Sequence, residues 1–235
     1  MPQTENNIRL DELTTAHLAD ACLRLGVAVR CGPHLLGPAV PGMRASGRVR
    51  PVRHCGSVDV FLEALEEAAA GDILVVDNDG RLDEACVGDL IALEVKRAGL
   101  AGIVIWGLHR DSQEVSEIGL PLFSLGVLST GPQRLDARPS DVFGWAKVGS
   151  HVVTSSDIVV ADGDGVLLLP EARLGEIVAV AATIRDTERR QAIAMAGGRS
   201  LRDQSRFGEY LARRHREPDY TFRQHLRDIG AAVEE

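Results

Sequence analysis

Apolar strands that alternate with helical segments constrain the fold of this sequence more than any other feature. The run Ile73–Val76 follows Gly71 and Asp72 and ends at the polar loop Asp77–Gly80. A strand that is apolar at every position is typical of a sheet covered on both faces. The elements expected after it are a helix at 88–99, a strand at 101–106, a short helix after Asp111 and a strand at 121–125. This alternation indicates an α/β fold.

Further elements are predicted on the N-terminal side of this region. One helix is expected over Leu10–Gly26, with Thr14 or Thr15 as N-cap and Gly26 as its end. Residues 35–52 are rich in Gly, Pro and Val without helical period, which favours short strands and turns. A helix is then predicted over 58–70. The apolar face of that helix is expected to be Phe61, Leu62 and Leu65.

The C-terminal half adds an antiparallel element and a long helix. Asp157–Ala161 and Val166–Leu169 flank the turn Asp162–Gly165, which predicts a hairpin and hence a mixed sheet. Pro170 can open a helix that ends near Gly197-Gly198. Its expected apolar positions are Leu174, Ile177, Val180 and Ile184. We predict one domain over 1–200 and a charged helical arm over 201–235.

Charge and composition narrow the classes of function. The formal charge of −8 at pH 7 would repel nucleic acid over most of the surface, so no nucleic-acid partner is expected. Met1–Asn7 contain no apolar signal region, and no apolar run approaches the roughly 20 residues of a membrane span. A cytoplasmic protein is therefore predicted. The four cysteines form no CxxC pair and are expected to be reduced and buried.

Two segments at strand and helix boundaries carry the candidate chemistry. If a helix begins near Gly88, the amides of Leu90 and Ile91 are unsatisfied donors suited to a substrate carboxylate. Arg110 offers a planar cationic fork, and Asp111 offers hard oxygen ligands. Magnesium needs only one or two protein carboxylates, so Asp111 is the candidate ligand for Mg²⁺ or Mn²⁺. The competing interpretations are a surface ion pair at residues 110–111 and simple helix capping at residues 88–89.

A resemblance to a known family favours the catalytic interpretation. Asp89, twenty intervening residues (109 − 89 = 20), then Arg110 and Asp111 resemble the D-x20-R-D motif of the 4-hydroxy-4-methyl-2-oxoglutarate aldolases. That family also contains the regulators of ribonuclease E activity. The segments that resemble the family are 71–77, 101–107, 121–126 and 162–166. Many members carry an acidic residue where this chain has Trp106.

The resemblance implies a fold, an assembly and an activity. The fold is a mixed-sheet β/β/α sandwich with swivelling-domain topology, and the assembly is a homotrimer or a hexamer. The activity is metal-dependent cleavage of 4-hydroxy-4-methyl-2-oxoglutarate-type aldols to pyruvate and a second 2-oxo acid, with oxaloacetate decarboxylation beside it. Asp89 would handle the hydroxyl proton through a water, and Arg110 would stabilise the substrate's carbonyl oxygen. Glu188 of a neighbouring subunit would complete the site, with Asp186 as the competing candidate.

Other functional classes receive less support from the sequence. The seven histidines show no HxH or HExxH arrangement, which argues against a histidine-ligated zinc aldolase. Lys96 lies among charged residues, which is unlike a Schiff-base lysine in an apolar site. The alternative that remains is a non-catalytic regulator that binds a ribonuclease or a helicase. Asp89, Arg110 and Asp111 together favour the enzyme.

Overall fold

A computed structural model describes residues 10–230, so the prediction for Met1–Asn7 lies outside the described residues. Eight strands form one mixed sheet in the order β1-β12-β11-β3-β4-β6-β8-β2. Their bounds are β1 Arg30–Cys31, β2 Gly37–Pro38, β3 Ala45–Arg53, β4 Ile73–Asp77, β6 Gly102–Trp106, β8 Leu122–Ser124, β11 Asp157–Asp162 and β12 Gly165–Pro170. Strands β3, β4, β6 and β8 run parallel, whereas β11 and β12 form an antiparallel hairpin.

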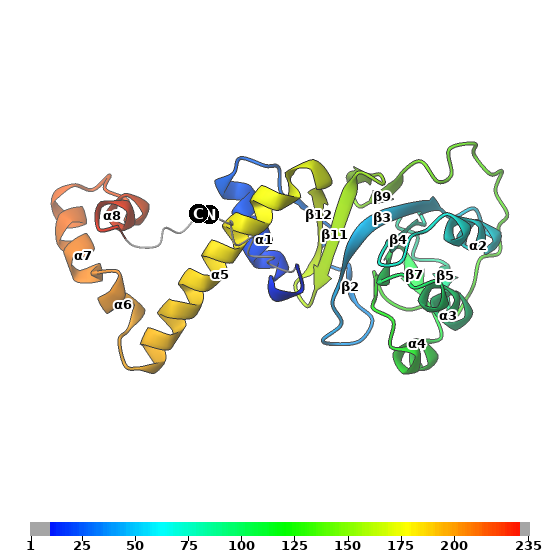
Figure 1. Ribbon diagram of the computed structural model, residues 1–235, viewed down its shortest axis with the longest axis horizontal. Helices are drawn as coiled ribbons and strands as arrows, with labels where there is room; N and C mark the ends of the chain where they lie inside the picture. Colours follow the sequence, from blue (N-terminus) through cyan, green and yellow to red (C-terminus); the bar gives the residue numbers. More distant parts are fainter. Residues whose placement is uncertain (1–9, 231–235) are drawn as a thin grey trace, which may run out of the picture.

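Two small sheets and a set of helices complete the described fold (Figure 1). The small sheets pair β5 Ala85–Val87 with β7 Leu108–His109, and β9 Ala146–Val148 with β10 His151–Val153. The helices of the main body are α1 Thr15–Arg24, α2 Asp59–Glu66, α3 Asp89–Arg97, α4 Ser112–Ile118 and α5 Leu174–Ala196. Short 3₁₀ turns at Leu10–Glu12 and Glu171–Arg173 precede α1 and α5. Helices α6 Leu201–Gln204, α7 Phe207–Arg216 and α8 Phe222–Asp228 follow.

Alternate residues of the central strands face two different layers. Val75 and Val104 point to the face covered by the β9–β10 ribbon, whereas Leu74 and Ile103 point to α2, α3 and α4. On the hairpin, Ile158 belongs to the core shared with α1 and α5. Ile158 pairs with Arg48 of β3, and residues 48, 50 and 52 of this strand share one face. Val52 belongs to the core that α2 and α3 cover. Helices α1 and α5 therefore lie on the same face of the sheet as α2, α3 and α4. The predicted β/β/α sandwich with swivelling-domain topology is confirmed.

Contacts of Thr14 and Thr15, the two predicted N-cap candidates, fix the start of α1. Thr14 caps the helix, and its hydroxyl accepts a hydrogen bond from the amide of His17. The buried Asp162 of the hairpin turn accepts hydrogen bonds from the amide and hydroxyl of Thr15, at 2.8 and 2.7 Å. Gly26, at φ +63°, follows the helix. The single helix predicted over Leu10–Gly26 is therefore a 3₁₀ turn followed by α1.

Several other predictions need correction. Residues 45–53 form one nine-residue strand, because they lie between β11 and β4 and bond to both. Helix α2 ends at Glu66 and buries Val60, Phe61 and Ala64, whereas Leu62 is exposed. Pro170 ends β12, and α5 begins only at Leu174. All four cysteines are free, but Cys31 is exposed because it lies on the edge strand β1.

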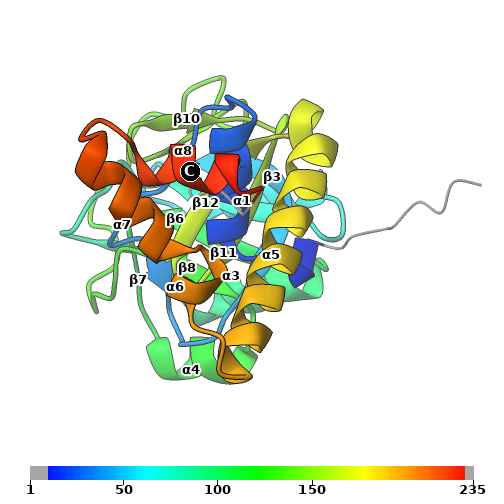
Figure 2. The same ribbon diagram turned by 90° about the vertical axis from the view of Figure 1, so that its left-hand side faces the viewer.

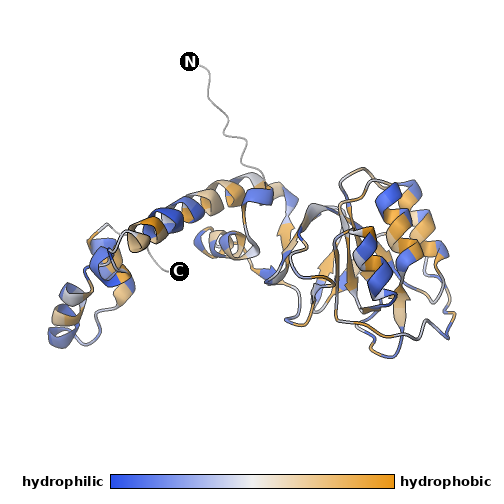
Figure 3. Cartoon of the chain, turned by 90° about the horizontal axis from the view of Figure 1, so that it is seen from below, coloured by the Kyte–Doolittle hydropathy of each residue, from blue (hydrophilic) through white to orange (hydrophobic). Residues whose placement is uncertain are grey.

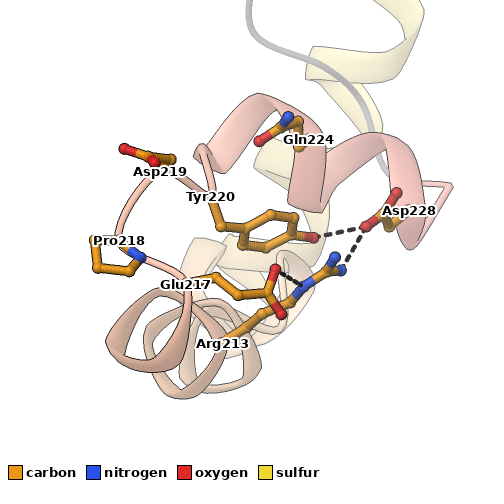
Figure 4. A pocket seen from close by; sticks show the side chains of 7 residues that line it. All are labelled: Arg213, Glu217, Pro218, Asp219, Tyr220, Gln224 and Asp228. Carbon is orange, nitrogen blue, oxygen red and sulfur yellow. Dashed lines mark hydrogen bonds and ion pairs between the residues drawn. The ribbon is translucent and has the colours of Figure 1, made fainter.

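The C-terminal residues form an arm of three short helices at the far end of α5 (Figures 1 and 2). Aromatic contacts among Phe207, Tyr210, Tyr220 and Phe222 hold α7 and α8 together. Arg213 stacks on the Tyr220 ring at 3.8 Å and bonds to Glu217 and Asp228 (Figure 4). The arm thus has a small core of its own. Its packing on a neighbouring subunit stays a prediction.

Helix α5 and the arm mix hydrophilic and hydrophobic residues along their length, and some of the hydrophobic ones are exposed (Figure 3). Ile193 of α5 and Leu211 of α7 are examples of such positions, at 72% and 49% exposed. Among residues 10–230, no helix joins the length and the apolar character needed to cross a bilayer.

Candidate active site

The small parallel sheet β5–β7 brings the two candidate segments together. Val87 pairs with His109, and the amide of Arg110 donates to the carbonyl oxygen of Val87 at 3.0 Å. The chain turns into α3 directly after Val87 and into α4 directly after Arg110 and Asp111. Residues separated by twenty positions in the sequence therefore become neighbours at the ends of two paired strands. The spacing of the D-x20-R-D motif follows from the length of α3 and β6 between them.

Asp111 has the most constrained backbone in this region. Its φ and ψ are 58° and 46°, the left-handed conformation that Asp and Asn adopt more readily than most residues. Its Oδ2 lies 3.4 Å from the amide nitrogen of Asp89 and 3.4 Å from Nε of Arg110. The carboxylate thus faces the positive end of the α3 dipole. Its side chain is 35% exposed, so solvent reaches it.

Gly88 leaves the space that the Asp111 carboxylate occupies. A Cβ at position 88 would lie 2.2 Å from Oδ2 of Asp111 and 3.3 Å from the Arg110 side chain. The backbone of Gly88 has φ −128°, which any residue can adopt. A larger residue at position 88 would therefore displace the Asp111 carboxylate rather than strain the backbone.

The predicted anion site at the start of α3 is only partly open. The amide of Leu90 donates to Oδ1 of Asp89 at 2.8 Å, so this donor already has an acceptor. The first regular helical bond runs from the amide of Ala92 to the carbonyl of Gly88. The Ile91 amide precedes it and lies beside the candidate site. A substrate carboxylate would have to displace the Asp89 side chain to reach the Leu90 amide.

A cavity of about 180 Å³ joins these residues. Gly88, Asp89, Leu90, Ile91, Arg110 and Asp111 all line it, as the sequence predicted for one crevice. The remaining wall comes from residues that the sequence analysis did not single out: His54, Gly56, Val58, Ala85, Cys86 and Pro132. Gly56, at φ +94°, allows a close approach, because a Cβ there would lie 2.1 Å from the carbonyl oxygen of Arg134. The one signal in the sequence for this part of the wall is Gly56 itself, which follows the end of β3.

His54 lines the cavity, and its contacts define which ring nitrogen carries the proton. The Arg134 guanidinium can only donate, so the Asn78 atom that faces it at 2.9 Å is the amide oxygen. His54 Nδ1 lies 2.9 Å from that same oxygen and therefore carries the proton. Glu84 holds Arg134 in place at 2.9 Å. Burial lowers the pKa of His54, which keeps the ring neutral at pH 7.

The donor atoms of the cavity suit a hard divalent cation. Asp111 and Asp89 supply carboxylate oxygens, the ligands that Mg²⁺ and Mn²⁺ prefer. Burial raises the pKa of the Cys86 thiol far above neutrality, so Cys86 remains a thiol and offers no thiolate to a soft metal. No cluster of three or more His, Cys, Asp or Glu side chains with metal-binding geometry occurs among residues 10–230. The cavity therefore suits a metal ion that binds one protein carboxylate and takes its other ligands from water and substrate.

Glu188 and Trp106 lie outside this cavity. Oε2 of Glu188 is 3.0 Å from Nε2 of His17, so its partner within the chain is a histidine of α1. Helix α5 lies away from α3 and α4 in Figure 1, and Glu188 does not line the cavity of its own chain. Trp106 packs over Gly80, where a Cβ would lie 2.6 Å from the indole ring. A contribution of Glu188 to a neighbouring subunit stays a prediction.

Gly88→Ala is expected to lower kcat/KM of any reaction carried out in this cavity by about 100-fold, because a displacement of about 1 Å at a reacting group costs that much. The new methyl group must push the Asp111 carboxylate away from its position. Gly175→Ala is the control, since a Cβ at position 175 meets nothing within 4 Å. Steady-state kinetics and thermal melting of both variants check the prediction. Equal activity of the two variants would contradict it.

The fold and cavity define a class of protein: a mixed α/β sandwich that presents an arginine and an aspartate beside a helix N-terminus. The chain belongs to the RraA-like family (Aldolase/RraA), whose pattern matches residues 15–168. The resemblance drawn from the motif is thereby confirmed. Asp89, Arg110 and Asp111 all lie within the matched region.

The chain is similar to an aldolase, to a protein of larger size and to a member of a ribonuclease inhibitor family. A 4-hydroxy-4-methyl-2-oxoglutarate aldolase of Thermus thermophilus is 34% identical over 132 residues, which cover 56% of this chain and 79% of the aldolase. Protein DlpA of Legionella pneumophila is 30% identical over 138 residues, covering 58% of this chain. The chain spans only 22% of the length of DlpA. The crystal structure of Streptomyces coelicolor RraAS2, an unusual member of the RNase ES inhibitor RraA family, matches with a TM-score of 0.68 and 27% identity. That match covers 83% of this chain and all of RraAS2.

Proposed function

We propose that this protein is a divalent-metal-dependent lyase that releases pyruvate from 4-hydroxy-2-oxo acids, with oxaloacetate decarboxylation as a side activity. One observation carries the proposal. Arg110, Asp111 and the start of α3 meet in one small cavity, although twenty residues separate the two parts of the motif. In this arrangement Gly88 leaves the space that the Asp111 carboxylate occupies. The aldolase named among the relatives supports this class of reaction.

Arg110 and Asp111 have distinct tasks in this proposal. Asp111 would hold Mg²⁺ or Mn²⁺, which when bound acts as a Lewis acid toward the 2-oxo acid. Arg110 donates to the carbonyl oxygen at C2, where negative charge grows as the C3–C4 bond breaks. The fixed cationic fork stabilises that charge more in the transition state than in the substrate. The electron pair of the broken bond is thereby accepted as the enolate of pyruvate.

Asp89 is placed to manage the proton in this proposal. Its carboxylate lines the cavity and is anchored on the Leu90 amide, which keeps it beside Asp111. In aldol cleavage, it takes the proton of the C4 hydroxyl through a water molecule and later returns a proton to C3 of the enolate. In oxaloacetate decarboxylation, the group that leaves is CO₂, and no hydroxyl proton has to be removed. Asp89 is therefore needed more for the aldol reaction.

The assembly is part of the proposal. We infer a homotrimer or a hexamer in which Glu188 of one subunit reaches the cavity of the next. The long helix α5 carries Glu188 away from the α3–α4 region of its own chain. Its hydrogen bond to His17 is solvent-exposed, so it is cheap to exchange for a contact with another subunit. Asp186, which bonds to Arg185, is the competing acidic residue.

Pyruvate release in the presence and absence of EDTA tests the function. We expect release from a 4-hydroxy-2-oxo acid and from oxaloacetate with Mg²⁺ or Mn²⁺, loss of both reactions on chelation, and recovery on adding the metal back. Lactate dehydrogenase, which needs no metal, reports the pyruvate. Turnover that survives complete removal of metal would contradict the proposed role of Asp111.

Regulation of a ribonuclease is the second candidate. The similarity to RraAS2, which spans the whole of that protein, is the observation that favours it. A regulator of this kind requires a binding surface and makes no demand on the cavity. Absence of any metal-dependent turnover, together with binding to a ribonuclease, would select this alternative.

A further inference from the structure

The segment that joins β8 to β9 runs along one wall of the candidate active site. Its residues 128–139 contain no helix or strand. Pro132 of this segment lines the cavity. A Cβ on Gly131 would lie 2.9 Å from Nη1 of Arg110, so the backbone passes directly beside that guanidinium. The position of the segment therefore helps to define the space in which the Arg110 side chain can lie.

Backbone hydrogen bonds hold the segment on either side of this stretch. The amide of Ala85 donates to the carbonyl oxygen of Thr130 at 2.8 Å, and the amide of Asp136 donates to that of Cys55 at 2.9 Å. Between them, residues 131–135 form no backbone–backbone hydrogen bond with any described residue. A stretch without such bonds is readily displaced, so side chains must fix its position.

Arg134 is the side chain that fixes this stretch. Its Nε lies 3.1 and 3.2 Å from the two carboxylate oxygens of Glu84, and its Nη2 lies 2.9 Å from Oε1 of Glu84 and 2.9 Å from Oδ1 of Asn78. Its Nη1 donates to Asp136. The Glu84 side chain is only 5% exposed, so this charge-assisted pair is largely shielded from water. Arg134 thereby joins residues 131–135 to the end of β4 and to the residue before β5.

The same guanidinium also sets the surroundings of His54. An Asn side chain can turn either its oxygen or its NH2 group toward a neighbour, but a guanidinium only donates and therefore requires the oxygen. Oδ1 of Asn78 faces Arg134, and Nδ1 of His54 donates to the same oxygen at 2.9 Å. None of Arg134, Glu84 and Asn78 lines the cavity, whereas His54 does. These three residues thus act on the cavity from behind its wall.

We propose that Arg134 is a positioning residue of the active site, which holds residues 131–135 beside Arg110 and fixes the ring of His54 in the wall. This inference rests on the proposed function, in which the Arg110 guanidinium must meet the carbonyl oxygen of the substrate. Without the Arg134–Glu84 pair, residues 131–135 can move away from that guanidinium. A shift of about 1 Å at this point is enough to lower the rate of the chemical step strongly.

Replacing both partners of the pair tests the inference without leaving a buried charge unpaired. Arg134→Met/Glu84→Met keeps side chains of similar size, so the protein should fold and melt close to the wild-type temperature. We expect kcat for pyruvate release to fall by about tenfold or more and KM to change by less than about threefold, because Arg110 acts in the transition state. The matched control is Arg138→Met/Glu63→Met, whose pair joins the same segment to α2 at 2.6 Å, is exposed and lies outside the cavity. The control should keep the wild-type kcat.

Nitrogen NMR of the His54 ring gives a readout that needs no substrate. The shifts of Nδ1 and Nε2 report which nitrogen carries the proton, and a His54→Gln variant identifies the signals. The wild type and the Arg138→Met/Glu63→Met control should carry the proton on Nδ1. Arg134→Met/Glu84→Met should show part of it on Nε2, because the amide of Asn78 is then free to turn its NH2 group toward the ring.

Two results would overturn the inference: equal kcat in the two double variants, or a His54 proton that stays on Nδ1 alone in both. Absence of pyruvate release by the wild type in the presence of Mg²⁺ or Mn²⁺ would instead overturn the proposed function. The NMR comparison would still test the contacts of Arg134 in that case.

Discussion

Asp111→Asn is expected to lower kcat/KM for pyruvate release by about 1,000-fold or more and to leave the fold intact. Asparagine has the same size and tolerates the left-handed backbone of residue 111, but it lacks the charge that would hold a divalent metal. The Lewis-acid contribution lost is several kcal/mol, and about 4 kcal/mol corresponds to a factor of 1,000. Coupled kinetics and metal titration measure the loss.

Stability separates the role of the carboxylate from that of the backbone. Asp111→Asn should keep the melting temperature within about 2 °C, because the side chain is partly exposed and belongs to none of the described cores. Asp111→Ala should be less stable by about 1 kcal/mol, since alanine at this φ is strained. Asp79→Asn is the control, being another aspartate in the left-handed region, at φ 54° and outside the cavity. Wild-type turnover in Asp111→Asn would remove this residue from the mechanism.

Arg110→Lys is expected to reduce kcat/KM nearly as much as Arg110→Ala, by about 100-fold or more. The loss of one preorganised donor to a developing oxyanion costs roughly 100- to 1,000-fold, and an ammonium is a point charge that cannot reproduce the fork. Nε of the guanidinium lies 3.4 Å from Oδ2 of Asp111. A lysine ammonium has no Nε and would lose this geometry.

The control for Arg110→Lys is Arg97→Lys, an exposed arginine at the other end of α3. It should keep wild-type kcat/KM. Comparison of KM and kcat shows whether Arg110 acts in the transition state, since a role in substrate binding alone would raise KM and leave kcat unchanged. Near-normal kcat in Arg110→Lys would contradict the assignment to the carbonyl oxygen.

Patterns within short stretches of sequence predicted those helices and strands that are determined by their own residues. The buried strands β4 and β6, the hairpin β11–β12 and the helix α3 follow from apolar runs, turn residues and periodicity. The length of β3 could not be predicted in this way. This strand contains three arginines and a proline, and it is held by pairing to strands that are distant in sequence. The exposure of Leu62 was missed for a related reason. The face that a short helix buries depends on where the sheet lies beneath it.

The centre of the site was predictable, whereas its walls were not. Asp89, Arg110 and Asp111 carry a recognisable spacing, and the structure brings all three into one cavity. His54 and Val58 carry no such spacing, since they reach the cavity from the end of β3 and the start of α2. The chain of contacts from Glu84 through Arg134 and Asn78 to His54 joins residues up to 80 positions apart and has no signature in the sequence. His54 and Val58 nevertheless form part of the cavity wall.

The position of Asp111 at the end of a strand, outside every described core, also bears on how the family could have diversified. A single-base change that converts aspartate to asparagine would remove the proposed metal ligand while the backbone conformation and the packing remain acceptable. Selection for stability would not oppose such a change, because the folded state loses little by it. Catalytic and purely regulatory lineages on this scaffold can therefore lie one substitution apart.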